Sequence, residues 1–161
     1  MRHSIISTNT IRDISNALVG KPCIVFDPNM RCAVKTTGLR TYPDVSVYCD
    51  KPLKDPEDPT GQTLTNPTVV IEILSPSTEA YDRGMKASHY RQIESLQAHV
   101  FVSQDQPRVE AFTRMPDGTW SFQEYAGLDK VLKLKSIEVD LRLSRIYDKI
   151  DFAEGADHAI V

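Results

Sequence analysis

The segment at residues 68–74, TVVIEIL, constrains the fold more than any other part of the sequence. It is nearly continuous in β-branched residues, which is typical of a strand that is buried on both faces of a sheet. Glu72 stands in the middle of this segment, although an isolated buried charge costs several kcal/mol. Glu72 must therefore be paired, protonated or bound to a metal. The segment predicts a central strand that carries a functional carboxylate.

Helical and strand patterns alternate along the rest of the chain. Apolar side chains recur at helical spacing within residues 3–18, and a second helix is expected at about 78–93, directly after the Glu72 strand. This order predicts the α/β class, with a mixed central sheet flanked by helices. The remaining expected elements are a short helix at 143–150 and strands at 23–26, 30–34, 42–48, 99–103, 109–114, 120–125 and 131–134.

The chain has 161 residues, which is the usual size of one domain. We predict a single domain over residues 1–150 and a frayed tail over 151–161. Residues 51–66 contain three prolines and one glycine. We therefore expect a long loop without regular structure there, and loops of that length are usually functional or mobile.

The cysteines and histidines predict neither a disulfide framework nor a zinc site. Cys23, Cys32 and Cys49 form no CxxC pair, and the N-terminus has no signal-peptide pattern, so we expect reduced, half-buried cysteines on strands. The four histidines share no spacing typical of zinc ligands. No apolar run approaches the roughly 18–20 residues that span a bilayer. The expected protein is cytoplasmic and makes no contact with a membrane.

Asp44 is the second carboxylate of interest. It follows a proline in YPDVSVY, where apolar and polar residues alternate as in a strand with one wet face. An aspartate at the start of such a strand can project towards a neighbouring strand. Two carboxylates that converge from adjacent strands, with water in the remaining positions, suit octahedral Mg²⁺. Such an ion lowers the pKa of a bound water and stabilises charge on a scissile phosphate.

The helix after the Glu72 strand supplies further candidates. Asp82, Lys86 and Tyr90 are spaced four residues apart and so share one helical face. A lysine close to a metal-bound water could orient that water or offset negative charge on the pentavalent phosphate. Spacing alone favours the simpler alternative, an ordinary Asp–Lys pair on the surface that contributes little to stability.

The motifs around these residues resemble the Uma-two family, whose members are assigned as restriction endonucleases within the PD-(D/E)xK nuclease superfamily. The resemblance begins with YPDVSV and PTVVIEILSPSTEAYDRGMKASHY. It continues through QAHVFVSQDQPRVEAFTR, DGTWSFQEYAGLDKVLKL and LRLSRIYDKI, and so covers nearly the whole chain. The long SPST–D–K–Y run is specific, whereas a bare PD followed by ExL would not be.

The resemblance implies a restriction-endonuclease-like core in which Asp44 and Glu72 hold Mg²⁺, or alternatively Mn²⁺. Two residues after Glu72, where the superfamily usually has its catalytic lysine, this chain has Leu74. In the family the lysine has moved to the following helix, and Lys86 occupies the matching position. Asp82 is then a partner that orients Lys86. Ser75 and Tyr90 are expected to support the site.

Family members usually begin with a further stretch before the first helix, which holds a glutamate and a strand–turn–strand. This sequence begins at about that helix, with His3 matching a residue near the start of the helix. Without the upstream glutamate, metal binding would be weaker. Without the hairpin, a sheet edge would be exposed.

Three functions follow from these residues. The first is Mg²⁺-dependent hydrolysis of DNA phosphodiester bonds, with DNA as the partner and a homodimer as the simplest way to cut both strands. The second is a catalytically idle module of the same fold that binds DNA or supports assembly. The third is a metal-dependent phosphoesterase for small nucleotides, which suits the net charge of −3 and the pI near 5.8 better.

Overall fold

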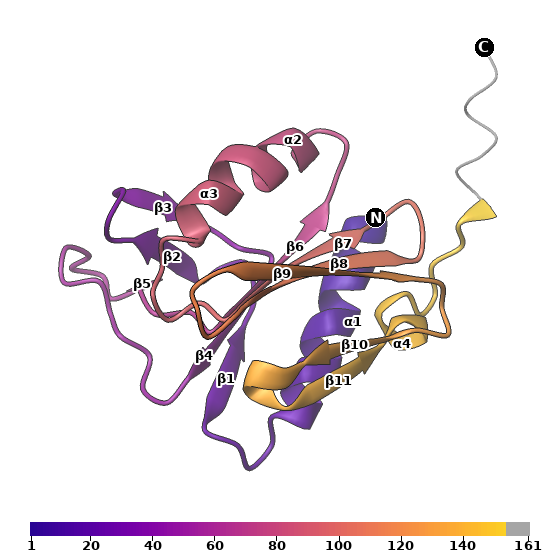
Figure 1. Ribbon diagram of the computed structural model, residues 1–161, viewed down its shortest axis with the longest axis horizontal. Helices are drawn as coiled ribbons and strands as arrows, with labels where there is room; N and C mark the ends of the chain where they lie inside the picture. Colours follow the sequence, from indigo (N-terminus) through magenta and orange to yellow (C-terminus); the bar gives the residue numbers. More distant parts are fainter. Residues whose placement is uncertain (154–161) are drawn as a thin grey trace.

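The computed structural model describes residues 1–153 and is built on a six-stranded mixed sheet in the order β1-β4-β6-β7-β8-β9 (Figure 1). The central strands β6 and β7 run parallel, and the other neighbouring pairs are antiparallel. This arrangement confirms the predicted class and the mixed sheet. The strands are β1 (Cys23–Phe26), β4 (Val45–Cys49), β6 (Val69–Leu74), β7 (Ala98–Ser103), β8 (Arg108–Arg114) and β9 (Trp120–Ala126).

One face of the sheet carries the larger part of the core. It is covered by α1 (Arg2–Ala17), the hairpin of β10 (Val131–Leu134) and β11 (Val139–Arg142), and the short α4 (Leu143–Ile146) (Figure 1). Helix α1 buries Ile6 and Ile14 completely against this face. Its observed bounds confirm the helix expected at 3–18.

The opposite face is covered by a second layer that begins directly after β6. This layer runs through α2 (Glu79–Tyr81), the five-residue π-helix η1 (Asp82–Lys86) and α3 (Ala87–Tyr90) (Figure 1). Beside it lies a small sheet of β2 (Arg31–Val34), β3 (Leu39–Thr41) and β5 (Thr63–Leu64). Ala87 packs on Leu74 and Phe101, so the helical layer lies directly over β6 and β7.

Several short elements differ from the sequence expectations. The segment at 51–66 was expected to lack regular structure, but β5 lies within it and pairs in parallel with β2. Strands β3 and β11 were not expected at all. The second helix ends at Tyr90 rather than near residue 93, and the last helix ends at Ile146 rather than residue 150. Contacts with distant segments decide where each of these short elements begins or ends. A local sequence pattern does not contain those contacts.

The predicted frayed tail falls largely on residues 154–161, which lie outside the described residues. Its beginning is ordered, because the ring of Phe152 packs on Tyr147 with centroids 5.4 Å apart. Within residues 1–153, no helix is long and apolar enough to cross a bilayer.

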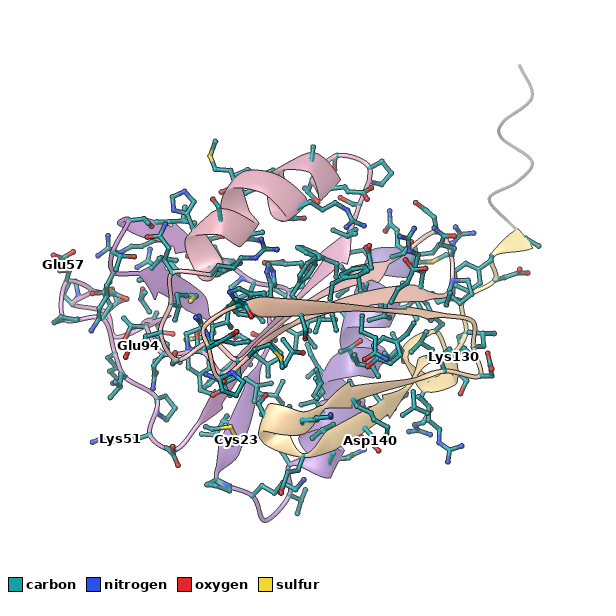
Figure 2. The ribbon with its side chains drawn as sticks, in the orientation of Figure 1. Cys23, Lys51, Glu57, Glu94, Lys130 and Asp140 are labelled. Carbon is teal, nitrogen blue, oxygen red and sulfur yellow. A yellow bond between two sulfur atoms is a disulfide. The ribbon has the colours of Figure 1, made fainter. Side chains whose placement is uncertain are left out.

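The expectation that all three cysteines are reduced is wrong for two of them. Cys23 on β1, labelled in Figure 2, forms a disulfide with Cys49 on β4. The antiparallel register of β1 and β4 places these two residues directly opposite each other. Cys32 is free and buried on β2.

Candidate active site

Asp44 and Glu72 meet at the point where β4 and β6 are paired. Val45 lies opposite Ile71 in this antiparallel pair, and one further step of the same register sets Asp44 opposite Glu72. Opposite residues project from the same face of a sheet. The backbone N–H of Asp44 donates to Oε2 of Glu72 at 3.3 Å, and that of Ile73 donates to Oδ2 of Asp44 at 2.8 Å. The two predicted carboxylates are therefore adjacent.

Lys86 reaches this pair of carboxylates from η1. Its Nζ lies 2.7 Å from Oε1 of Glu72 and 3.4 Å from Oδ1 of Asp82. All three side chains are buried, with exposed fractions of 8% or less. Asp82 and Lys86 therefore do not form the surface pair that their spacing alone favours. π-Helical turns are rare and occur often at functional sites.

Leu74 explains how the helix comes to lie close enough for this contact. Two residues after Glu72, Leu74 projects from the same face of β6 and is buried against Ala87 of α3. The position that holds a lysine elsewhere in the superfamily thus anchors the helix that carries Lys86.

Burial and charge set the protonation of the site. Burial raises the pKa of Glu72 to about 7, against the opposing effect of the Lys86 ammonium. Burial by itself would lower the pKa of Lys86, but the carboxylates of Glu72, Asp82 and Asp44 outweigh it and raise that pKa above the ordinary value. Lys86 is therefore a fixed cation at neutral pH, whereas Glu72 exchanges its proton near neutrality.

Tyr90 and Ser75, the two other predicted supporting residues, lie in different surroundings. Tyr90 is fully buried, and Nζ of Lys86 lies 5.8 Å from the centre of its ring, within the range of a cation–π contact. The Ser75 hydroxyl hydrogen-bonds with those of Ser77 at 3.2 Å and Thr78 at 2.8 Å. Tyr90 thus belongs to the cluster of Asp44, Glu72 and Lys86, while Ser75 shapes the turn before the helix.

His3 is a residue of the site that the sequence reasoning did not assign to it. Its Nε2 lies 3.2 Å from Oδ2 of Asp44, and 37% of its side chain is exposed. The Asp44 carboxylate accepts a hydrogen bond from the imidazole and thereby raises the pKa of His3. His3 also lines a groove of about 680 Å³ that follows α1. No local pattern could reveal this contact, because it joins the start of α1 to a strand 41 residues later (44 − 3).

The donor set can be compared with what a metal ion requires. In residues 1–153, no three His, Cys, Asp or Glu side chains are arranged so that they could hold a metal ion. Mg²⁺, however, is commonly bound by one or two carboxylates and keeps several waters. Oδ2 of Asp44 accepts from Ile73, and no described residue donates to Oδ1. The adjacent carboxylates of Asp44 and Glu72 fit Mg²⁺ held partly by water.

The chain is similar in sequence to two known proteins. The chain is 36% identical over 151 residues to the uncharacterized protein slr1290 of Synechocystis sp., covering 93% of this chain and 76% of that protein. The uncharacterized protein sll1609 of the same organism is 26% identical over 137 residues, covering 85% and 76% of the two chains.

A solved structure shares the fold at low sequence identity. It is the crystal structure from Anabaena variabilis of "a putative nuclease belonging to DUF820", which matches with a TM-score of 0.74 and 18% identity. The match covers 91% of this chain and 80% of that one. It therefore supports the restriction-endonuclease-like fold.

A family model described as "Putative restriction endonuclease" matches residues 1–145, which include α1, Asp44, Glu72 and the helix of Lys86. The match confirms the resemblance inferred from the motifs. The chain belongs to the Uma2 family of nuclease-like proteins.

Proposed function

We propose that this protein is a Mg²⁺-dependent endonuclease that hydrolyses DNA phosphodiester bonds. The observation that carries the proposal is the buried ion pair of Lys86 and Glu72 beside Asp44. Burying an ion pair is costly, and replacing one by apolar residues often stabilises a protein. The fold therefore gains little stability from this buried pair. Its presence favours a chemical role for Lys86 and Glu72.

Each residue has a distinct part in this proposal. Asp44 and Glu72 would hold Mg²⁺, which when bound supplies an activated water and stabilises charge on the phosphate. Asp82 and the Tyr90 ring fix the Lys86 ammonium, so that its charge is already in place when negative charge develops on the phosphate. Asp44 and His3 are the more exposed members of the cluster, with 18% and 37% of their side chains accessible. The substrate would approach from their side.

The other two functions remain distinct alternatives. A catalytically idle module that binds DNA does not require a buried ion pair. The short distance between Lys86 and Glu72 therefore supports the catalytic function. A phosphoesterase for small nucleotides would use the same residues. Double-strand cleavage is most simply performed by two symmetry-related copies, and we include a homodimer in the proposal.

A panel of substrates tests the proposal against the alternatives. Fluorescently labelled duplex DNA, single-stranded DNA and bis-p-nitrophenyl phosphate would be incubated with Mg²⁺, Mn²⁺ or EDTA. We expect cleavage of DNA that requires the metal. Hydrolysis of the small ester alone would favour the phosphoesterase, and binding of DNA without cleavage in either metal would favour the idle module.

Asp44→Ala should remove the binding site for the metal. Titration calorimetry with Mn²⁺ should show one site in the wild type and none in the variant, because Mg²⁺-type sites depend on their carboxylates. Asp55 offers a matched control, since it is a buried aspartate whose ion pair is with Arg40 rather than with a residue of the candidate site. Asp55→Ala should retain the Mn²⁺ site. Undiminished binding by Asp44→Ala would exclude Asp44 as a ligand.

The affinity for Mn²⁺ should rise between pH 6 and pH 7 and level off above pH 8. Because the pKa of Glu72 is raised to about 7, a proton competes with the metal below that pH. The loss should approach roughly tenfold per pH unit when one deprotonation is required. Protonated His3 beside Asp44 acts in the same direction. An affinity that stays constant from pH 6 to pH 8 would exclude Glu72 as a ligand with this pKa.

A further inference from the structure

A group of aromatic and arginine side chains lies on the same sheet face as Glu72, towards the edge strand β9. In the antiparallel register of β8 and β9, Phe112 lies opposite Phe122 and Arg114 lies opposite Trp120. Arg91, at the end of α3, lies over Phe112. We call these five residues, Arg91, Phe112, Arg114, Trp120 and Phe122, the aromatic–arginine face.

Each of the two arginines lies over an aromatic ring. The guanidinium carbon of Arg91 lies 4.8 Å from the centre of the Phe112 ring, and that of Arg114 lies 4.5 Å from the centre of Trp120. Arg114 also donates to the carbonyl oxygens of Leu96 at 2.7 Å and Ile93 at 2.8 Å. The hydrogen bonds fix the Arg114 guanidinium, and the Phe112 ring positions that of Arg91, without neutralising either charge.

Neither arginine has a carboxylate partner among the described residues. The carboxylates nearby are already paired, because Glu110 contacts Arg83 and Arg108, and Glu124 contacts Arg108. The two charges of Arg91 and Arg114 are thus available to an anion. An uncompensated pair of fixed cations is notable in a chain whose net charge is −3.

Phe122 gives this face an exposed ring. It is 53% exposed, although its centroid lies only 5.2 Å from that of the half-buried Phe112. A single exposed apolar residue needs no explanation in itself. Here the exposed ring continues a row of packed rings that begins at Phe101 and is flanked by the two free arginines.

The row connects the candidate active site with the sheet edge. Phe101 lies opposite Glu72 on β7, and Arg83, three residues before Lys86, lies over its ring at 5.4 Å. From β6 to β9 there are three strand spacings of about 4.8 Å, or roughly 14 Å in all. A nucleic-acid strand that contacts Phe122 would pass around the helical layer, which covers Phe101, to reach Asp44 from its exposed side.

We propose that the aromatic–arginine face binds single-stranded DNA, with a base stacked on Phe122 and phosphates attracted by Arg91 and Arg114. The inference rests on the proposed nuclease function and adds to it a surface that binds an unpaired strand. Exposed aromatic side chains stack with unpaired bases, whereas in a duplex each base is already stacked between its neighbours. Fixed arginines beside an open ring match a strand that offers both bases and phosphates.

Fluorescence anisotropy with a labelled 20-nucleotide single strand and the matching blunt duplex tests this proposal. Measurements in EDTA separate binding from cleavage. Phe122→Leu keeps the apolar contact with Phe112 but removes the ring, and should weaken binding of the single strand about tenfold. Phe122→Tyr keeps the ring and should bind like the wild type. Binding of the duplex should change little in either variant.

Arg91→Gln tests the electrostatic part. Loss of one phosphate contact should reduce the dependence of single-strand binding on salt, lowering the slope of log K against log salt by about 0.7. Ile24→Ala is the matched control for Phe122→Leu, because Ile24 is 49% exposed on β1 at the other edge of the same sheet. This control should bind as the wild type does.

The outcomes separate this inference from the proposed function. Equal single-strand affinity in the wild type and Phe122→Leu would overturn the inference, even if the wild type cleaves DNA. Ring-dependent binding without cleavage would support the inference and count against the nuclease. If Phe122→Leu instead converts a dimer to a monomer in sedimentation and leaves binding unchanged, the face is a contact between copies and the inference is wrong.

Discussion

Lys86→Ala is expected to slow metal-dependent DNA cleavage about 100-fold or more, which is the scale of losing one positioned electrostatic group. The ammonium lies 2.7 Å from Glu72 and is fixed by Asp82, so its charge needs no rearrangement during the reaction. The affinity for Mn²⁺ should stay the same or rise, because a nearby positive charge has been removed. Single-turnover cleavage of duplex DNA at saturating metal measures the effect.

Two further variants interpret that result. Lys86→Arg should restore the rate only in part, because a planar guanidinium differs from a compact ammonium. Lys133→Ala is the matched control, since Lys133 forms a lysine–aspartate pair with Asp140 at 3.0 Å that is more than half exposed. It should cleave as the wild type does. If Lys86→Ala also cleaves at the wild-type rate while folded, Lys86 has no role in the chemistry.

Glu72→Gln should abolish Mn²⁺ binding while leaving the protein as stable as the wild type or more so. The amide can still accept the N–H of Asp44, and Lys86 keeps Asp82 at 3.4 Å, so neither a bare charge nor an empty space is created. Removing a buried carboxylate whose pKa is raised by burial takes away a cost of folding at neutral pH. Calorimetry and thermal unfolding at pH 7.5 measure both effects.

Glu110→Gln provides the comparison on the same sheet face. Glu110 is also buried, but it is paired with Arg83 and Arg108 and lies outside the candidate site. The variant should bind Mn²⁺ normally. A large fall in melting temperature for Glu72→Gln would show that the carboxylate is a structural hydrogen-bonding group, and its catalytic assignment would be withdrawn.

The central strand and its carboxylate could be predicted because a strand that is buried on both faces has a characteristic composition. A run of β-branched residues around Glu72 indicates a strand that is covered on both faces, and the structure buries all six residues of β6. The alternation after Pro43 predicts a strand over residues 42–48, and the observed β4 begins at Val45, directly after Asp44. That the two carboxylates lie opposite each other depends on the register of β4 and β6, which the sequence does not state.

The position of Lys86 illustrates what local spacing cannot decide. An aspartate and a lysine four residues apart are compatible with a solvent-exposed face as well as a buried one. The difference arises because Leu74 and Ala87 pack together and hold the helix over β6. Within the sequence, only the family resemblance favours the buried arrangement.

The disulfide and the short strands were missed for a related reason. Cys23 and Cys49 are 26 residues apart and become neighbours only through the pairing of β1 and β4. Strand β5 has two residues in a segment rich in proline, and it forms because β2 and Lys54 provide backbone partners. Contacts between distant segments determine both features, and no pattern within either segment contains them.

Nicking of supercoiled plasmid DNA by the wild type and by Glu72→Gln tests the central claim most directly. Both proteins would be assayed at equal concentration with Mg²⁺, with Mn²⁺ and with EDTA, after circular dichroism has shown that both are folded. We expect the wild type to convert supercoiled DNA to the nicked or linear form only when the metal is present, and Glu72→Gln to leave it supercoiled. Nicking by Glu72→Gln at the wild-type rate, or no nicking by the wild type in either metal, would contradict the assignment of this site.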